Sequence, residues 1–111
     1  MIKIRVDYLG DLYCNVVHTP LGNSFKTNAP IDNKGKGDFI SPTDLVAASI
    51  ASCVTTIMGI KAQDKGIDIK GMNITASKIM TEVPFRRIEK LILDITFPNK
   101  LNDENFKLLS N

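Results

Sequence analysis

The sequence predicts an α+β fold in which a largely antiparallel sheet packs on one long, central, buried helix. Two observations carry this prediction. Residues 41–65 hold a run of small and apolar residues between a helix start signal and a helix stop signal. The segments on either side, residues 2–27 and 67–97, contain alternating apolar and polar residues, which is typical of strands. With 111 residues the chain predicts a single domain over residues 1–111, large enough to bury a core.

The N-terminal part predicts three short strands followed by a loop. Residues 2–8 alternate apolar and charged side chains, and Gly10–Asp11 is a turn signal that leads into a second strand over residues 12–19. A third, short strand is expected over residues 24–27. Residues 28–39 hold prolines, glycines, asparagines and aspartates, so we expect a loop there.

The central helix has clear boundaries. Ser41 is suited to cap the helix, and Asp44 completes a capping-box-like pattern three residues later. Gly66 suits a left-handed stop. The uncharged run of residues 45–60 is shorter than the roughly 18 residues of a membrane span. A helix that is apolar on every side is buried, so we expect this helix at the centre of a soluble core.

The C-terminal part predicts two longer strands and a second helix. In residues 67–76 the apolar side chains fall at odd positions before Gly71 and at even positions after it. A β-bulge at Gly71 would bring both groups of apolar side chains to one face of the sheet. Residues 81–85 contain a proline and predict a turn, and residues 91–97 form the clearest alternation in the chain. Asn102 is placed to cap a helix that begins at the next residue and runs toward the end of the chain.

Composition and charge exclude several classes of protein. The net charge is +2, with acids and bases interspersed, so there is no electrostatic case for nucleic acid or for an anionic membrane. The N-terminus lacks the apolar block of a signal peptide, and we therefore expect a cytoplasmic location. Two cysteines and one histidine supply too few ligands for a metal site.

Cys53 is the residue most able to carry chemistry. As a thiolate it would attack a peroxide oxygen and become a sulfenic acid. Composition alone favours a plainer interpretation, since cysteine is among the residue types most often buried as a small apolar side chain. Cys53 lies about three turns from the helix start, beyond the reach of the helix dipole. A cation from another segment would have to activate it.

The segment SPTDLVAASIASC resembles the signature of the OsmC/Ohr superfamily, a group of bacterial thiol-dependent peroxidases. The spacing from Pro42 to Cys53 is similar to that of the family. Upstream, NAPIDNKGKGDFISP resembles the family's glycine-rich loop, and downstream SKIMTEVPFRRIEKLILDITFPNKL resembles its strand, turn and strand. The resemblance implies an OsmC-like fold and an intertwined homodimer, with sheets outside and central helices packed across the dimer.

The resemblance also implies a site. Cys53 matches the family's peroxide-reactive cysteine, and Arg86 and Asp44 are the candidates for the cation and the carboxylate that activate it. Arg87, Arg5 and Lys26 are other candidate cations. The implied substrate is a small organic hydroperoxide, reduced with electrons from an external dithiol and without cofactor or metal. A pocket at the dimer interface would be lined by apolar residues, for which the candidates are Phe39, Ile50, Val54 and Ile57.

Each implied role has a plainer alternative. Asp44 also has the position of an ordinary helix N-terminal carboxylate. Arg86 lies in a charged turn that predicts a solvated connection. The family's second, resolving cysteine lies in a segment beyond Asn111, so we expect the chain to lack the C-terminal part of the fold. Cys14 is expected to be a core residue; its alternative role is that of a resolving thiol.

Two other functions remain open at this stage. The first is a non-catalytic dimeric module that binds a small apolar ligand, or a redox sensor that is oxidised once at Cys53. The second is a structural half-domain that is unstable without a partner surface. Turnover separates an enzyme from a sensor, because only an enzyme consumes excess hydroperoxide when a dithiol is present.

Overall fold

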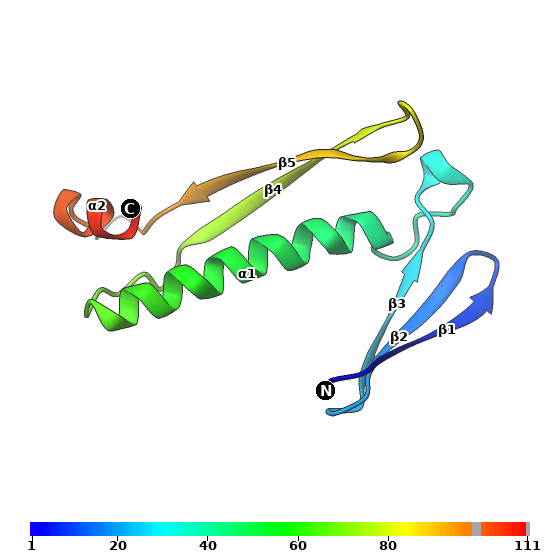
Figure 1. Cartoon of the computed structure of the whole chain (residues 1–111), viewed down its shortest axis with the longest axis horizontal. Helices are drawn as coiled ribbons and strands as arrows, with labels where there is room; N and C mark the ends of the chain where they lie inside the picture. The colour runs from blue at the N-terminus through cyan, green and yellow to red at the C-terminus, as the bar shows by residue number, and fades with distance from the viewer. Residues whose placement is uncertain (99–100, 111) are drawn as a thin grey trace. The chain divides into compact units, whose positions relative to one another are not determined.

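The structure, a computed structural model, describes residues 1–98 and 101–110 (Figure 1). It divides into two compact units, residues 1–45 and 46–111. The elements in chain order are β1 (Ile4–Gly10), β2 (Tyr13–His18), β3 (Asn23–Asn28), a short 3-10 helix (Ile31–Asn33), α1 (Pro42–Asp64), β4 (Asn73–Thr81), β5 (Arg87–Thr96) and α2 (Asp103–Ser110). Helices and antiparallel sheets together confirm the α+β class.

The first unit is built on an antiparallel sheet in the order β1-β2-β3. The three predicted strands are confirmed, with ends that differ from the prediction by one or two residues. One face of the sheet is mainly apolar, and its large side chains on β1 and β3 are exposed to solvent: Ile4, Val6, Tyr8 and Phe25. In residues 1–45 no apolar side chain is buried, whereas Thr27, Asn28 and Ser41 are.

The loop between β3 and α1 is closely folded. Gly35 lies so near the carbonyl oxygen of Ala29 that a Cβ built on it would be 1.6 Å from that oxygen. Gly37 has a φ of 68°, in the left-handed region that favours glycine. The glycines therefore serve a close approach of two backbone segments, and the loop ends at the buried Ser41.

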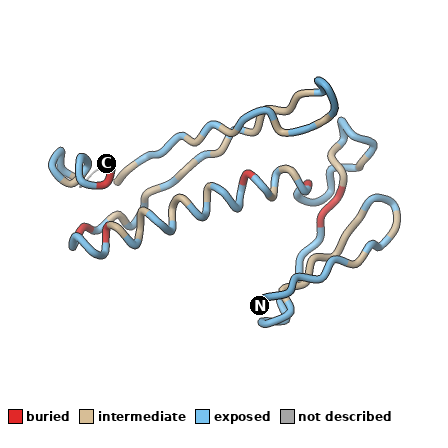
Figure 2. Tube along the Cα trace, viewed as in Figure 1, coloured by how far each residue is buried: buried red, intermediate tan, exposed pale blue. Residues whose placement is uncertain are grey.

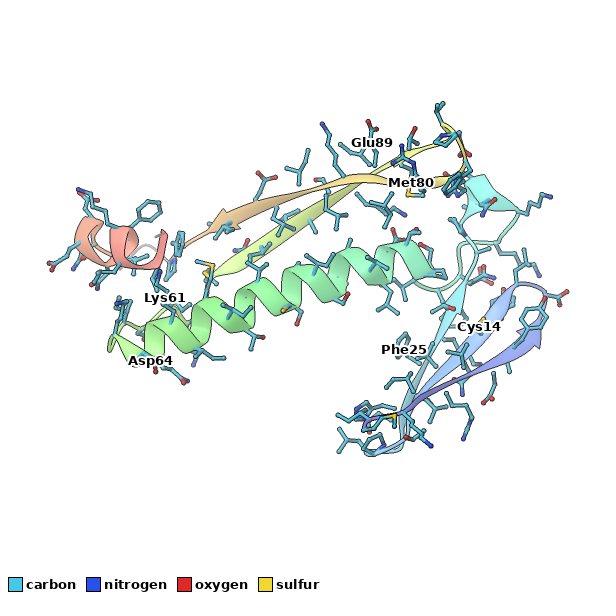
Figure 3. All side chains as sticks on the ribbon, in the orientation of Figure 1. Cys14, Phe25, Lys61, Asp64, Met80 and Glu89 are labelled. Atoms are coloured by element: carbon cyan, nitrogen blue, oxygen red, sulfur yellow. The ribbon has the colours of Figure 1, made fainter. Side chains whose placement is uncertain are left out.

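The second unit contains most of α1, the β4–β5 hairpin and α2. Its core lies near the end of α1, where Ala62, Ile67 and Leu109 are buried together. The ammonium group of Lys61 reaches from α1 toward α2 and donates to the carbonyl oxygen of Leu109 at 3.5 Å (Figure 3). The rings of Phe97 and Phe106 meet edge to face beside this core, with centroids 5.1 Å apart.

The burial predicted for α1 is wrong for a single chain. Only Ala47 and Ala62 are buried among its 23 residues, and Figure 2 shows the helix exposed or half-buried elsewhere. The sequence correctly predicts the helix and its bounds to within one residue, but an apolar pattern does not say whether the chain itself buries the helix. By length and composition α1 is also apolar enough to cross a membrane, a test that the core helix of a water-soluble protein passes equally well.

The predicted glycine bulge at Gly71 is also wrong. Gly71 has a φ of 97° and lies in the turn before β4, which begins only at Asn73. The register shift of this hairpin lies instead between Ile79 and Met80. Ile67, which was expected on the strand, contributes to the core at the end of α1.

The second helix confirms its predicted start. The side-chain oxygen of Asn102 accepts a hydrogen bond from the backbone N–H of Asn105 at 2.8 Å, as expected for a cap. The helix α2 then runs from Asp103 to Ser110. Its predicted last residue, Asn111, lies outside the described residues.

Candidate thiol site on helix α1

The helix that carries Cys53 is fixed at both ends by the predicted signals. At its start, the hydroxyl of Ser41 accepts from the backbone N–H of Asp44 at 3.1 Å. At its end, Gly66 has a φ of 67°, and the N–H of Ile67 returns to the carbonyl of Ala62 at 2.8 Å. The left-handed Gly66 and the hydrogen bond from Ile67 to Ala62 form a Schellman-type stop at the end of the helix. The position of Cys53 along α1 is therefore set by local sequence.

Cys53 lies on the exposed side of α1. The half-buried and buried positions form a stripe through Ala47, Ala51, Val54, Met58 and Ala62, at the spacing of one helix face. At about 100° per residue, the residues of this stripe lie about 100–180° around the helix from Cys53. Its thiol is thus presented outward by a rigid helix and is not covered by the rest of its own unit.

Four residues neighbour Cys53 on the helix surface, one turn before or after it. Ser49 and Thr56 lie to one side, and Ile50 and Ile57 lie to the other. All four are exposed. The thiol therefore lies between a hydroxyl-bearing side and an isoleucine side of α1.

The neighbouring hydroxyls direct their protons into the helix. Ser49 donates to the carbonyl oxygen of Val46 at 2.8 Å, and Thr56 donates to that of Ser52 at 2.9 Å. In residues 1–98 and 101–110, no hydrogen bond or ion pair joins the Cys53 thiol to another group. Activation of the thiol would therefore need a cation that this chain's α1 does not itself supply.

Arg86 lies in the connection between β4 and β5, as the predicted turn requires. It forms an ion pair with Glu82, 3.1 Å apart, in an i,i+4 arrangement. Arg87 donates to the carbonyl oxygen of Val83 at 3.0 Å. Neither arginine is brought to Cys53 within the described part of the chain.

Asp44 lies in the first turn of α1. It is nine residues before Cys53, which corresponds to about 13 Å along the helix axis. The carboxylate therefore does not contact the thiol of its own chain, and its position suits the positive end of the helix. The predicted pairing of Asp44 with an activating arginine stays a prediction.

A second polar cluster lies in the first unit, around the buried side chain of Asn28. Its oxygen accepts from the backbone N–H groups of Lys36 and Gly37 at 3.0 and 2.9 Å. Its amide nitrogen donates to the carbonyl oxygen of Leu12 at 3.1 Å. One asparagine thus joins the glycine-rich loop to the turn between β1 and β2.

Beside this loop, the hydroxyl of Tyr13 donates a short hydrogen bond to the carboxylate of Asp38. This bond, with smaller effects from burial and from the charges of Asp38 and Asp11, raises the pKa of Tyr13 above its ordinary value. The ring of Tyr13 meets Phe39 edge to face at 6.0 Å, and the ammonium of Lys26 lies 5.8 Å from the centre of the Phe39 ring.

Cys14 lies on the apolar face of the first sheet, opposite Tyr8 on β1 and Thr27 on β3. It is a half-buried free thiol. His18 shares this face, and its buried Nδ1 has no hydrogen-bond partner in the described part of the chain. Among the described residues, no group of three or more His, Cys, Asp or Glu side chains is placed to hold a metal ion.

Comparison with known proteins decides the family. The model of the OsmC-like protein family matches residues 35–110, more than half of the chain. The chain belongs to the OsmC-like protein family. The match includes all of α1 with Cys53, so the resemblance predicted from the segment before and around Cys53 is confirmed.

Solved structures of similar proteins agree with the assignment to the OsmC-like family. A Psychrobacter arcticus protein, provisionally named as an osmotic stress induced and detoxification response protein, is 44% identical with a TM-score of 0.88, over 99% of this chain and 80% of that one. An organic hydroperoxide resistance protein OsmC of Legionella pneumophila is 18% identical, with a TM-score of 0.75 and coverages of 99% and 80%. The organic hydroperoxide resistance protein OhrB of Bacillus subtilis is 16% identical, with a TM-score of 0.64 and coverages of 99% and 81%. At such low identity the last two show the OsmC-like fold alone. The search of curated proteins gives no match.

Sequence reasoning about this OsmC-like chain missed two features near its candidate sites. Ser49 and Thr56 flank Cys53 at spacings of four and three residues, a signal that the sequence does contain. Asn28 gave no such signal, because an asparagine in a loop-forming segment is equally typical of an exposed turn. Its burial becomes evident only when the loop is folded over it.

Proposed function

We propose that this OsmC-like chain is a thiol-dependent peroxidase that reduces organic hydroperoxides at Cys53. The observation that carries the proposal is an exposed thiol at the family's cysteine position, bordered by the isoleucines Ile50 and Ile57. Two of the solved proteins with the same fold are named for organic hydroperoxide resistance. An exposed thiol with apolar neighbours suits a peroxide that carries a hydrocarbon group.

The proposed enzyme is a homodimer. The first sheet leaves a face of large apolar side chains exposed, and α1 exposes Val46, Ile50, Ile57 and Ile60 on the side of Cys53. Exposed apolar surfaces of this kind mark association sites. A second copy of the chain is the occupant that the family resemblance implies. Sedimentation equilibrium tests this, and a monomer at micromolar concentration would contradict it.

We assign activation of the thiol to Arg86, with Asp44 as a supporting carboxylate, and place this arginine on the partner subunit. The assignment rests on the outward direction of Cys53 on α1 and on Arg86, which pairs with Glu82 and is not brought to Cys53 within the described residues. Reduction of the oxidised enzyme is assigned to an external dithiol in the cytoplasm. The single domain over residues 1–111 is supported by a family match that crosses the boundary between the two units.

The proposal is tested by anaerobic titration with cumene hydroperoxide. Intact-mass spectrometry and a sulfenic-acid trap follow the product, and Cys53→Ser and Cys14→Ser are the matched controls. We expect stoichiometric oxidation that requires Cys53, does not require Cys14, and is faster than with hydrogen peroxide. Oxidation no faster than that of an ordinary exposed thiol would reject the peroxidase.

A single-turnover redox sensor is the second candidate. It is favoured by one observation: within the described residues neither a cation nor a second thiol contacts Cys53. Excess hydroperoxide and a dithiol separate the two functions. An enzyme consumes many equivalents of peroxide, whereas a sensor stops after one.

A further inference from the structure

Two different kinds of contact hold the glycine-rich loop between β3 and α1 to the first sheet. In residues 29–37 the contacts are backbone hydrogen bonds and bonds to the buried side chain of Asn28. In residues 38–40 they are mainly contacts between exposed side chains. Segments held by exposed contacts open more readily than segments held by buried ones, so the two parts of the loop should differ in local stability.

The first part of the loop is closed around Asn28. The N–H groups of Lys36 and Gly37 donate to the side-chain oxygen of Asn28 at 3.0 and 2.9 Å. The N–H of Ala29 donates to the carbonyl oxygen of Leu12 at 3.2 Å, which ties the start of the loop to the turn between β1 and β2. A buried polar group that loses its partner costs free energy. This part should therefore stay closed as long as the sheet is folded.

The backbone is held less firmly from Asp38 onward. The N–H of Asp38 lies 3.5 Å from the Asn28 oxygen, beyond the usual hydrogen-bond range of about 2.7–3.2 Å. Phe39 and Ile40 are large apolar residues that are both exposed. One backbone bond reaches this part, from the N–H of Asn28 to the carbonyl oxygen of Ile40 at 3.3 Å.

The side-chain contacts of the last part gather on Tyr13 of β2. The Tyr13 hydroxyl donates to the carboxylate of Asp38, and its ring meets the ring of Phe39 edge to face, with centroids 6.0 Å apart. The ammonium group of Lys26 on β3 lies 5.8 Å from the centre of the Phe39 ring. Water can replace a partner lost at an exposed site, so each of these contacts breaks at a low cost.

We propose that residues 38–40 form a strap that opens and closes on the first sheet separately from the rest of the loop, and that Tyr13 holds this strap closed. The strap leads directly to Ser41, whose hydroxyl caps α1. Its closed state therefore fixes the path by which the chain enters the helix. The device lies within residues 1–45 and does not depend on the proposed peroxidase.

Opening of the strap has a distinct signature in the backbone amides. When the strap is open, the N–H of Asn28 has lost the carbonyl of Ile40 and exchanges its hydrogen with solvent. The N–H groups of Lys36 and Gly37 keep the Asn28 oxygen and stay protected. Amide hydrogen exchange followed by NMR thus distinguishes opening of the strap from opening of the whole loop.

The strap is tested with Tyr13→Phe, and Tyr8→Phe is the matched control. Tyr13→Phe keeps the aromatic ring and removes the hydrogen bond to Asp38. Tyr8 is the other tyrosine of the chain, and its hydroxyl accepts from the backbone N–H of Leu12 at 3.3 Å. The two variants therefore lose the same chemical group at two places on the first sheet.

In Tyr13→Phe, exchange of the Asn28 amide should become about threefold faster, as expected for the loss of one exposed hydrogen bond. The amides of Lys36 and Gly37 should keep their rates, and Tyr8→Phe should leave all three rates unchanged. Asp38→Ala should accelerate the Asn28 amide to the same extent as Tyr13→Phe. The double variant should go no further, because both changes remove one and the same bond.

Three results would overturn the strap. The first is equal exchange of the Asn28 amide in Tyr13→Phe and Tyr8→Phe. The second is acceleration of the Lys36 and Gly37 amides in parallel with that of Asn28, which would mean that the loop opens as one piece. The third is an additive effect in the double variant, because Tyr13 and Asp38 would then act through different contacts. Circular dichroism of each variant records that the fold is kept, so the exchange rates are compared between folded proteins.

Discussion

The side-chain amide of Asn28 donates to the carbonyl oxygen of Leu12 at 3.1 Å, while its oxygen receives two backbone N–H groups from the glycine-rich loop. Asn28 is fully buried. Its backbone N–H also donates to the carbonyl oxygen of Ile40, next to the residue that caps α1. One side chain thus fixes the first turn of the sheet and the loop that leads into α1.

We expect Asn28→Ala to lower the free energy of unfolding by about 2–3 kcal/mol, because buried N–H groups lose their acceptor. Asn23→Ala is the matched control, since Asn23 is on the same strand and exposed. Its cost should stay within about 0.5 kcal/mol. Urea denaturation followed by circular dichroism measures both, and equal midpoints for the two variants would contradict the role of Asn28.

The hydrogen bond from Tyr13 to Asp38 predicts a pH dependence of stability. The pKa of Tyr13 is raised in the folded chain, so folding favours the protonated phenol. The contribution is fully present below the ordinary tyrosine pKa of about 10 and is lost as the pH rises through the higher pKa of the folded chain. In Tyr13→Phe this alkaline loss should disappear.

Tyrosinate absorbance measures the raised pKa of Tyr13 directly. The unmodified protein should show a transition above the ordinary tyrosine pKa of about 10, and this transition should be absent from Tyr13→Phe. Asp38→Asn should lower the pH of this transition, because the accepting carboxylate is the main cause of the shift. An unchanged absorbance titration in Tyr13→Phe above that pH would reject this assignment.

Local signals in the sequence predict much of this fold. Ser41 and Gly66 define α1 because capping and a left-handed stop are properties of a few neighbouring residues. The alternation in residues 91–97 correctly indicates β5, although the strand begins earlier, at Arg87. The turn at Gly71 was mistaken for a bulge, because a parity change in the sequence fits a bulge and a strand start equally well.

The site is less predictable, because its geometry depends on contacts between segments distant in sequence. Cys53 follows from the family motif, but its outward direction depends on which face of α1 the rest of the unit half-buries. Arg86 follows from a charged turn, and its ion pair with Glu82 agrees with the plainer alternative. Most of α1 is left unburied by the described residues of its own chain, and an apolar pattern in the sequence does not say whether the chain itself buries a helix.

The close approach of Gly35 to Ala29 predicts a strict need for glycine at that position. A Cβ there would lie 1.6 Å from the carbonyl oxygen of Ala29, so the backbone would have to move. Gly35→Ala should therefore destabilise the chain by more than about 2 kcal/mol. Gly59→Ala is the control: apart from its chain neighbours and the nearby backbone of α1, no described atom lies within 4 Å of its built Cβ, and alanine in a helix interior should stabilise by about 1 kcal/mol. Thermal unfolding of the two variants should thus shift in opposite directions, and shifts of the same sign would reject this account.

The core at the end of α1 predicts different costs for two neighbouring leucines of α2. Leu109 is 5% exposed and packs with Ala62 and Ile67, whereas Leu108 is 39% exposed. Leu109→Ala removes buried methyl groups and leaves a cavity, which should cost about 2–3 kcal/mol. Leu108→Ala should cost less than about 1 kcal/mol. Both changes keep the backbone carbonyl of Leu109 that accepts the hydrogen bond from Lys61. The difference between the two losses of stability therefore measures side-chain burial alone. Equal losses in urea denaturation would mean that α2 is not anchored through Leu109.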